Sequence, residues 1–386
     1  MPSTLHGYRL IAALLLYLFI SPIISASDEA ILMPSPPVVI GSSYILEDFN
    51  SHKVIVEKNS DKTLSPASLT KIMTAYVVFS EIKKGKLSLT DKVTVSENAW
   101  KMPGSRMFIE VGTQVMVEDL LKGLIIQSGN DASVALAEHI AGNEANFVLL
   151  MNEQAQRLKL INTHFQNSMG LPTENHHTTA KDLILLTRAL ITDFPEYYVW
   201  ESQKEFTYNN IKQRNRNRLL WKDSSVDGVK TGHTNEAGYC MVASAKRDNM
   251  RLISVVMGAK SESARTAESQ GLLNYGFRFY ETHRLYQAQQ SLKKVRIWKG
   301  ERKELKLGVE KDLYITIAKR YYENLKIETK TDKKIIAPVI KGQVYGAVTI
   351  TLKGELIKRV PLIALEDIAI GSIFQRFYDH LLQLIE

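Results

Sequence analysis

The sequence predicts a mixed α/β domain, followed by an all-β domain and one amphipathic helix. In the first part, strand-like segments near both ends enclose segments with helical periodicity. From about residue 285 the chain reads as short alternating strands joined by close turns such as Lys353-Gly354-Glu355, which is typical of a β-sandwich. The last stretch, Ile368 to Ile385, repeats apolar residues on one helix face. We therefore expect three structural regions, at 27–284, 285–365 and 366–386.

The N-terminus has the features of a removable export signal. Arg9 supplies a positive charge, Leu10 to Leu18 is almost wholly apolar, and Ser25-Ala26-Ser27 offers small residues for cleavage. The apolar core is short for a membrane span. We expect residues 1–26 to be a cleaved signal peptide, with an uncleaved N-terminal anchor as the alternative.

Composition excludes several classes of protein. The 386 residues are 45% hydrophobic and 23% charged, which is ordinary for a globular protein. The formal charge of +8 suits either an anionic partner or mere solubility, and nothing resembles a nucleic-acid-binding module. Cys240 is the only cysteine, so the chain has no intrachain disulfide, and no Cys/His spacing indicates zinc. We expect Cys240 to act as a small apolar filler and the protein to need no metal or organic cofactor.

The first strands lead into a helix that carries a candidate nucleophile. Residues 38–58 read as two strands that form a hairpin: Val38–Ile40 and Ser43–Leu46 precede a turn at Asp48–Ser51, and Lys53–Glu57 follows it. A helix then follows, with Ser65 as its expected N-cap and Pro66 in its first turn.

Within this helix, Ser68 and Lys71 are three residues apart and therefore share one face. A serine hydroxyl needs an adjacent base, and lysine can be that base only if its pKa is lowered. The apolar residues that follow would bury the helix. Because Ser-x-x-Lys is common by chance, a helix start with a solvated lysine remains the alternative.

A second polar element interrupts two apolar helical runs at Gln127–Asp131. Ser128 could relay a proton and Asn130 could hold a substrate amide, or Asn130 could simply cap the next helix. Further helices are expected at 146–160 and 180–191. Between them, residues 162–172 form an irregular crossing.

Two later segments carry cations. Residues 211–218 place basic side chains on one face if the chain is extended, either as an anion-binding face or as a solvated edge: Lys212, Arg214, Arg216 and Arg218. Lys230-Thr231-Gly232 lies on an expected strand, next to two more at 238–245 and 250–257. Lys230 adds a charge and Thr231 a hydroxyl, and Gly232 allows a ligand backbone to come close.

The three short motifs occur in the order found in penicillin-binding proteins and class A β-lactamases: Ser68-x-x-Lys71, Ser128-Gly129-Asn130 and Lys230-Thr231-Gly232. With KTGHT followed by AGY, and with the segment MRLISVVMG, the chain resembles the type-5 low-molecular-mass penicillin-binding proteins, serine D-alanyl-D-alanine carboxypeptidases of the bacterial periplasm. The resemblance covers about residues 35–386. It implies a β-lactamase/transpeptidase-like catalytic domain, with an antiparallel sheet between helical layers, then a C-terminal β-sandwich.

The resemblance also implies residue roles. Ser68 is similar to the family's nucleophile and Lys71 to its base, Ser128 and Lys230 complete the proton network, and Asn130 holds the acyl side. Backbone N–H groups of Ser68 and His233 would form the oxyanion hole. Arg216 and Thr231 match groups that hold the terminal carboxylate, and Gly232 keeps that strand open. Arg265 matches a further arginine near the site, unless it is a plain surface residue of its helix.

The implied reaction removes the terminal D-alanine from peptidoglycan stem pentapeptides through an acyl-enzyme on Ser68, with β-lactams as covalent inhibitors. One alternative is a β-lactamase, but the crossing reads Phe165-Gln166-Asn167 where a class A enzyme would need Glu-x-x-Leu-Asn. A D,D-endopeptidase, which the extra β domain argues against, and a non-catalytic penicillin-binding murein scaffold are the others.

The C-terminal helix would then anchor the protein on the outer face of the inner membrane, facing the periplasm. Its apolar face comprises Ile370, Ile373, Phe374, Phe377, Tyr378, Leu381, Leu384 and Ile385. This stretch has more acidic residues than basic ones, Arg376 being the basic one, so anchoring would depend on apolar area rather than on attraction to lipid charge. The alternative is a helix packed on the β domain.

Overall fold

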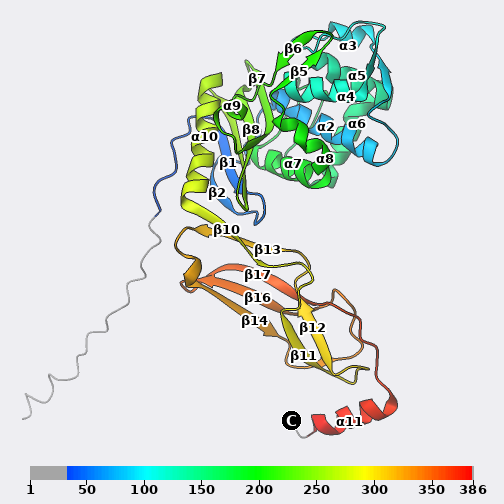
Figure 1. The fold of residues 1–386 in the computed structure, drawn as a ribbon, viewed down its shortest axis with the longest axis vertical. Coiled ribbons are helices and arrows are strands. Elements are labelled where there is room, and N and C mark those ends of the chain that lie inside the picture. The colour runs from blue at the N-terminus through cyan, green and yellow to red at the C-terminus, as the bar shows by residue number, and fades with distance from the viewer. Residues whose placement is uncertain (1–32, 385–386) are drawn as a thin grey trace, which may run out of the picture. The chain divides into compact units, whose positions relative to one another are not determined.

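A computed structural model describes residues 33–384 of the chain (Figure 1). The predicted signal peptide, residues 1–26, lies outside the described residues. In the described part, no helix combines the length and apolar character needed to span a membrane.

A five-stranded antiparallel sheet forms the centre of the first domain. Its order is β2-β1-β9-β8-β7, with Ile45 opposite Val255 and Lys230 opposite Val242. The strands are β1 (Ser43–Asp48), β2 (Val54–Lys58), β7 (Val226–Thr234), β8 (Gly238–Arg247) and β9 (Met250–Ala259). The predicted strand at Val38–Ile40 is wrong: Val38 and Ile40 are largely exposed, and the ladder begins at Ser43.

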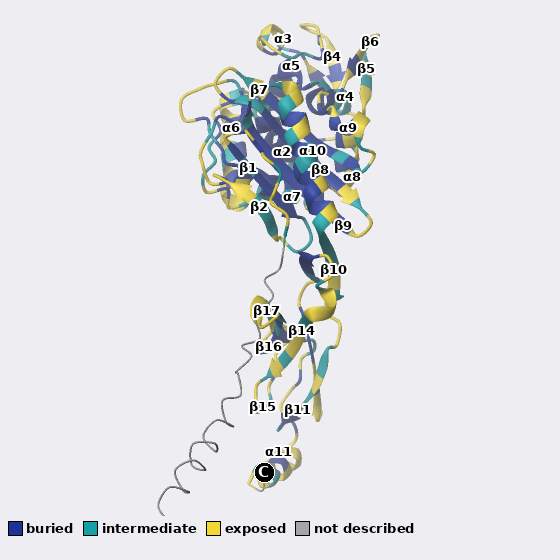
Figure 2. Ribbon diagram, turned by 90° about the vertical axis from the view of Figure 1, so that its left-hand side faces the viewer, coloured by how far each residue is buried: buried dark blue, intermediate teal, exposed yellow. Residues whose placement is uncertain are grey.

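Helices cover both faces of this sheet, which confirms the predicted layers (Figures 1 and 2). Neighbouring residues of β9 point to opposite faces: Val255 belongs to the larger apolar core, and Val256 to a smaller one under α10 (Glu262–Phe279). The other face packs against the remaining helices, which are α2 (Lys71–Lys83), α3 (Glu97–Lys101), α4 (Val117–Lys122), π-helical η2 (Gly123–Gln127), α5 (Asn130–Ala141), α6 (Glu144–Arg157), α7 (Ala180–Asp193), α8 (Pro195–Tyr198) and the 3₁₀ turn η3 (Val199–Ser202).

Three small elements complete this domain. They are the hairpin of β3 (Lys92–Thr94) and β4 (Gln114–Met116), the hairpin of β5 (Glu205–Tyr208) and β6 (Ile211–Arg214), and α9 (Leu219–Lys222).

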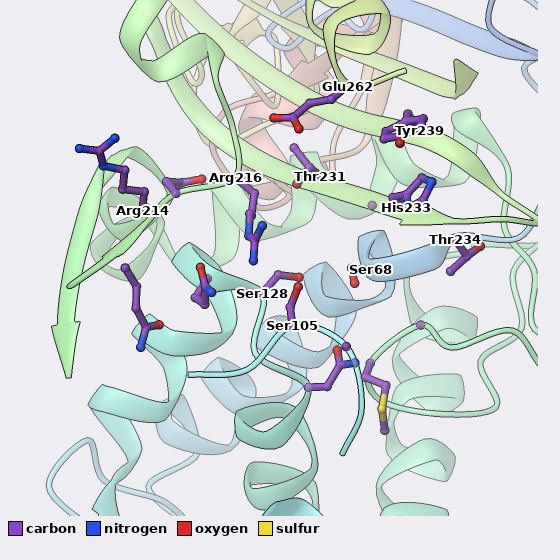
Figure 3. Close-up of a pocket in the computed structure, with 18 of the residues that line it drawn as sticks. Ser68, Ser105, Ser128, Arg214, Arg216, Thr231, His233, Thr234, Tyr239 and Glu262 are labelled. Carbon is purple, nitrogen blue, oxygen red and sulfur yellow. The ribbon is translucent and has the colours of Figure 1, made fainter. Parts of the chain in front are cut away.

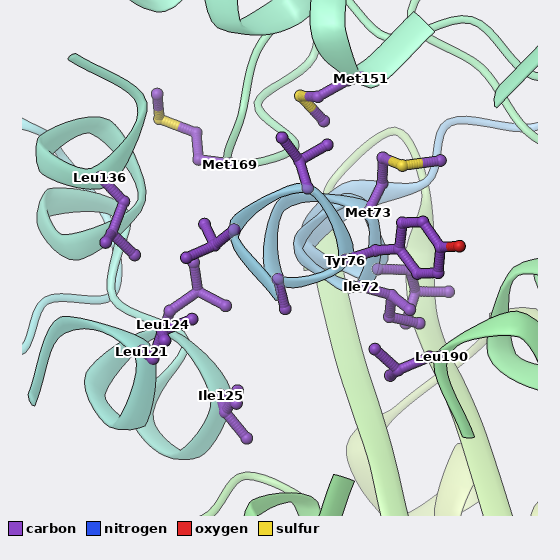
Figure 4. Close-up of a cluster of buried hydrophobic side chains, with 14 of the residues drawn as sticks. Ile72, Met73, Tyr76, Leu121, Leu124, Ile125, Leu136, Met151, Met169 and Leu190 are labelled. Carbon is purple, nitrogen blue, oxygen red and sulfur yellow. The ribbon is translucent and has the colours of Figure 1, made fainter. Parts of the chain in front are cut away.

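Helix α2 is enclosed on all sides, as its apolar run predicts (Figure 4). Residues 71–79 are all buried, and α2 packs against α5, α6, α7 and η2. The predicted helix start is wrong. A 3₁₀ turn, η1 (Ala67–Thr70), precedes α2, and Pro66 rather than Ser65 stands at its cap, without a side-chain hydrogen bond. The turn is closed instead by Leu69 N–H, which donates to the Pro66 carbonyl.

The C-terminal part is β-rich, and its two sheets share one apolar cluster. The larger sheet has the order β14-β16-β17-β12-β11-β15, and the smaller pairs β10 with β13. The elements are β10 (Tyr280–Tyr286), β11 (Lys293–Trp298), β12 (Glu304–Gly308), β13 (Leu313–Ala318), η4 (Tyr322–Asn324), β14 (Leu325–Thr331), β15 (Ile335–Ile336), β16 (Val344–Leu352) and β17 (Glu355–Ala364). The expected boundary at residues 284 and 285 falls inside β10.

The terminal helix α11 (Ile373–Gln383) begins later than Ile368, so that part of the prediction is wrong. Ile368 is buried and bridges Val339, and Ile370 bridges Gly300, so this stretch is held as extended chain. Ser372 and Gln375 form a reciprocal capping box that starts the helix.

Candidate active site

Ser68 and Lys71 meet at the junction of η1 and α2. Lys71 Nζ lies 3.1 Å from Ser68 Oγ, and it also donates to Asn130 Oδ1 and to the Met169 carbonyl, at 2.7 Å each. Lys71 is fully buried, whereas Ser68 is partly exposed and lines a cleft. The lysine is therefore not the solvated side chain of the alternative interpretation.

The surroundings of Lys71 favour its neutral form. Burial, and then the positive charge of Lys230, hold the pKa of Lys71 well below its usual value. Burial is also the main reason why the pKa of Lys230 falls to about 7, although Glu201 raises it, and the further cations near Lys230 are Arg265 and Arg216. We expected mutual repulsion between the lysines to lower their pKa values. Desolvation proves to be the larger cause for both.

Ser128 occupies a strained turn between η2 and α5. Its φ of 65° lies in the left-handed region, which is uncommon for serine, and Gly129 N–H closes the turn by donating to the Gly123 carbonyl. Asn130 does not cap α5 with its side chain, because its amide donates to the Pro103 carbonyl and accepts from Lys71. The Asn130 side chain thus joins the 103–107 loop to Lys71, and Ser128, two residues earlier in the turn, lines the cleft.

Lys230 reaches Ser128 from strand β7. Its Nζ donates to Ser128 Oγ at 2.8 Å and to the Thr231 carbonyl at 3.1 Å. β7 also passes close to the candidate nucleophile, since a methyl group at Gly232 would lie 3.1 Å from Ser68 N and 3.1 Å from the Pro66 carbonyl oxygen. Glycine at this position lets the strand lie against the start of η1.

A cleft of about 730 Å³ collects the predicted site residues (Figure 3). Ser68 and Ser128 lie at its centre with Ser105, which the motifs did not indicate. The other predicted residues that line the cleft are Asn130, Arg216, Thr231, Gly232, His233 and Arg265. Lys71 and Lys230 are buried behind the two serines.

Two arginines make this cleft attractive to an anion. Figure 3 shows Arg216 pointing toward Ser128. Arg265 is buried rather than on the surface of α10, and its Nη1 donates to the Gly232 carbonyl. Its Nε is buried and has no hydrogen-bond partner among the described residues. A substrate carboxylate is a chemically suitable partner for these guanidinium groups.

The basic segment 211–218 keeps its predicted alternation, but its ladder ends at Arg214. Lys212, Arg214, Arg216 and Arg218 are all exposed, with buried Gln213, Asn215 and Asn217 between them. Glu205 pairs with Lys212 and Arg214, and Glu262 pairs with Arg218. These three cations therefore fit a paired surface edge, and Arg216 projects toward the two serines.

Some residues that shape the cleft escaped the motif analysis. The Asp131 carboxylate accepts hydrogen bonds from the N–H groups of Met107, Phe108 and Ile109, and so fixes the loop that forms one wall. Met169 orients Lys71 through its carbonyl, and Gly170 lies against Ala67. The Met169 carbonyl belongs to the backbone, so its role leaves no mark in the sequence. The role of Asp131 depends on the position of the loop whose N–H groups it accepts from, and only the folded structure shows that position.

No group of His, Cys, Asp or Glu in residues 33–384 has a geometry that could hold a metal ion. The chemistry offered by the described residues is a hydroxyl beside a buried amine, within a positively charged cleft.

Comparison with protein families gives two matches. Residues 31–261 match the model of the D-alanyl-D-alanine carboxypeptidase peptidase family, and residues 280–369 match the C-terminal domain of penicillin-binding protein 5. The chain is 46% identical to D-alanyl-D-alanine carboxypeptidase DacC of Escherichia coli over 372 residues, covering 94% of this chain and 92% of the relative. It is 43% identical to DacA of the same organism over 358 residues, covering 91% and 89%.

Solved structures agree with this assignment. Penicillin-binding protein 5 from Haemophilus influenzae superposes with a TM-score of 0.84 at 44% identity, covering 87% of this chain and 99% of that one. Penicillin-binding protein D2 from Listeria monocytogenes, in an ampicillin-bound form, superposes with a TM-score of 0.59 at 29% identity, covering 63% and 100%. Both structures share the scaffold that carries the cleft, the first over 87% of this chain and the second over 63%, and the chain belongs to the D-alanyl-D-alanine carboxypeptidase family.

Proposed function

We propose that the protein removes the terminal D-alanine from peptidoglycan stem pentapeptides by transferring the acyl group first to Ser68 and then to water. The observation that carries the proposal is the contact between Ser68 Oγ and the buried Lys71 Nζ at the centre of a cationic cleft. Family membership supplies the substrate class, because the curated relatives are named for this dipeptide end.

In the acylation step, the Ser68 hydroxyl gives its proton to the neutral amine of Lys71 as Oγ attacks the carbonyl between the two D-alanines. Negative charge develops on that carbonyl oxygen. The N–H groups of Ser68 and His233 are the proposed donors to it, and the close passage of β7 beside Ser68 N supports this pairing.

Collapse of the tetrahedral intermediate breaks the C–N bond, and the leaving nitrogen takes a proton from Ser128. Lys230 can replace that proton, since its Nζ is hydrogen-bonded to Ser128 Oγ. Arg216, Thr231 and Arg265 hold the leaving group's carboxylate, and Asn130 holds the acyl side. The proton that Lys71 received from Ser68 returns to Lys230, so that Lys71 is a neutral base again. Water then attacks the ester, Lys71 takes a proton from it and gives that proton to Ser68 Oγ as the ester bond breaks, which restores the enzyme.

Release of D-alanine from a synthetic pentapeptide tests the proposal. Purified protein is expected to release one D-alanine for each peptide, and the Ser68→Ala variant none, because no acyl-enzyme can form. A Ser133→Ala variant, which removes a buried hydroxyl that donates to the Ser168 carbonyl, is the control for a serine outside the cleft. Equal release by wild type and Ser68→Ala would contradict the proposal.

β-Lactams should acylate Ser68 as mimics of the D-alanyl-D-alanine end. The ampicillin-bound form of the Listeria relative supports this extension. Parallel assays of benzylpenicillin hydrolysis and D-alanine release separate a carboxypeptidase from a β-lactamase. We expect the peptide to turn over and the penicillin to remain bound.

Helix α11 is proposed to hold the protein on a membrane surface outside the cytoplasm. Its apolar side chains are exposed, among them Phe374 at 86% and Phe377 at 63%. Asp379 on the other side is buried and accepts from Lys299 N. This arrangement favours an interfacial helix over one whose apolar face is packed on the β domain.

We likewise propose a domain boundary between Phe279 and Tyr280, where α10 passes into β10.

Replacing Phe374 and Phe377 together by serine is expected to abolish sedimentation with vesicles of phosphatidylethanolamine and phosphatidylglycerol. D-Alanine release in solution should be unchanged, because the helix is remote in sequence from every cleft residue. Leu149→Ser, at an exposed leucine of α6, is the matched control. A truncation should follow Gly371 rather than Leu365, because Ile368 is buried. Undiminished vesicle binding by the double variant would rule out this anchor.

A further inference from the structure

A second exposed apolar segment lies at the end of the β-rich part that carries α11. It runs through residues 333–341 and includes β15, where Ile335 is buried in the apolar cluster and Ile336 is 46% exposed. The same alternation returns further on, since Val339 is 2% exposed and Ile340 is 66% exposed. Figure 2 shows β15 at the end of its sheet next to α11. Ile336 and Ile340 therefore offer apolar surface close to the exposed apolar side chains of that helix.

Backbone hydrogen bonds join this segment to the chain that leads into α11. Val339 and Ile368 each donate an N–H to the other's carbonyl, at 2.9 and 3.0 Å. Lys341 N donates to Asp367 Oδ1 at 2.8 Å. Ile373 follows Ile368 by five residues, so at most ~18 Å of extended chain separates the paired residues from the start of α11.

The turn after β11 holds the segment and the helix together from another side. The Trp298 carbonyl accepts from Ala337 N at 2.9 Å, and Lys299 N donates to Asp379 Oδ2 of α11 at 2.5 Å. Gly371 N also donates to the Lys299 carbonyl, at 2.8 Å. Because one turn bonds to both, the segment and α11 belong to a single built surface.

The segment carries positive charge that carboxylates of the protein do not neutralise. Its three lysines are exposed, and within residues 33–384 none of their ammonium groups forms a salt bridge: Lys333, Lys334 and Lys341. Other cations of the same sheet are paired, Lys294 with Glu304 and Lys330 with Glu328. The acidic residue within residues 332–341 is Asp332, which leaves a net charge of about +2. Exposed isoleucines beside unpaired lysines are a combination that suits an anionic lipid surface.

We propose that residues 333–341 are a second membrane-contacting element, in which Ile336 and Ile340 enter the interfacial layer and the three lysines attract anionic lipid head groups. The proposal rests on the membrane attachment proposed for α11. On that helix Arg376 is exposed and Asp379 is buried, so α11 itself supplies little attraction to lipid charge. The lysines of the segment supply it instead.

The first test replaces the three lysines together by glutamine in the full-length protein and measures sedimentation with vesicles. On vesicles of phosphatidylethanolamine and phosphatidylglycerol, binding should be about 100-fold weaker than for wild type, because each lysine near such a surface contributes about 1 kcal/mol. On vesicles of phosphatidylethanolamine and phosphatidylcholine, binding should be unchanged. The matched control makes the same change at three exposed lysines of the first domain, Lys58, Lys62 and Lys92, and should bind both vesicles as wild type does.

The second test asks whether the segment itself enters the lipid. Ile340→Cys is labelled with a fluorophore whose emission moves to shorter wavelength in an apolar environment, and Cys240 does not compete because it is buried. Adding vesicles that contain phosphatidylglycerol should shift the emission. The same label at Ile161→Cys, an isoleucine of the first domain that is 84% exposed, should not respond.

The outcomes separate the two membrane proposals. Wild-type protein that stays in the supernatant with every vesicle would refute both the α11 anchor and the second contact. Protein that sediments, with an unshifted label at position 340 or with undiminished binding by the triple variant, would refute the second contact alone, as would an equal loss in the control. Emission that shifts with protein concentration in the absence of vesicles would place a second copy of the chain on this surface and would also overturn the proposal.

Discussion

Lys71→Ala is expected to reduce acylation of Ser68 by penicillin at least ~100-fold while the protein remains folded, since a positioned general base contributes about 10²–10⁴-fold. In the wild type, the buried amine lies 3.1 Å from Ser68 Oγ, and burial holds its pKa well below the usual value of a lysine, which favours the form that accepts a proton. Alanine leaves no base at that distance. Covalent labelling with a fluorescent penicillin, followed over time, measures the loss.

Folding must be followed in the same samples, because Lys71 also donates to Asn130 and to the Met169 carbonyl. Leaving two buried acceptors without a donor costs about 1–3 kcal/mol each, which a thermal melt will record. Lys83→Ala, at the exposed end of the same helix, is the matched control and should label at the wild-type rate. Normal labelling of folded Lys71→Ala would remove Lys71 from the mechanism.

Gly170→Ala is expected to be among the most destabilising single substitutions in the first domain, with a loss of ~3 kcal/mol or more and no detectable acylation. The new methyl group would overlap the backbone carbonyl of Ala67 and lie 2.9 Å from Ser68 N. The obstructing atoms belong to the main chain, so no side-chain rotation relieves the overlap. Gly170 also has a φ of +92°, which alanine adopts only at a cost.

Gly142→Ala separates these two effects. Gly142 has a φ of +77°, but an added methyl group there meets no atom of the described part of the chain within 4 Å. The Gly142→Ala variant should therefore lose only about 1 kcal/mol of unfolding free energy, the cost of placing alanine at a positive φ, and should keep the wild-type acylation rate. Denaturant unfolding of both variants measures the difference. If the two variants lose the same stability, the close approach of Gly170 to Ala67 is not what holds Ser68 in place.

Local patterns predicted most of the fold because its elements have strong signals of their own. The apolar run after Lys71 predicts a buried helix, and the segments 238–245 and 250–257 predict neighbouring strands. The failures fall where contacts distant in sequence decide the outcome. Val38 and Ile40 look like a strand but find no ladder, and Ile368 leaves the terminal helix because it pairs with Val339.

The residues of the cleft likewise fall into two groups, those that the sequence predicts and those that only the fold reveals. Side chains that react or carry charge, such as Ser68, Lys71 and Lys230, stand in short motifs whose order suggests that they meet. Residues that act through shape have no such signal. Gly170 is one of 21 glycines, and only the fold shows what its missing side chain permits.

The position of Cys240 within β8 affects how the protein tolerates oxidants. The single thiol is fully enclosed by the sheet and its helices, and burial raises its pKa to about 11, so very little reactive thiolate exists at neutral pH. Native molecules should therefore not become cross-linked to one another through sulfur in an oxidising compartment. The rate at which an alkylating reagent modifies Cys240 would instead measure how often the sheet opens, and so how often the catalytic domain unfolds.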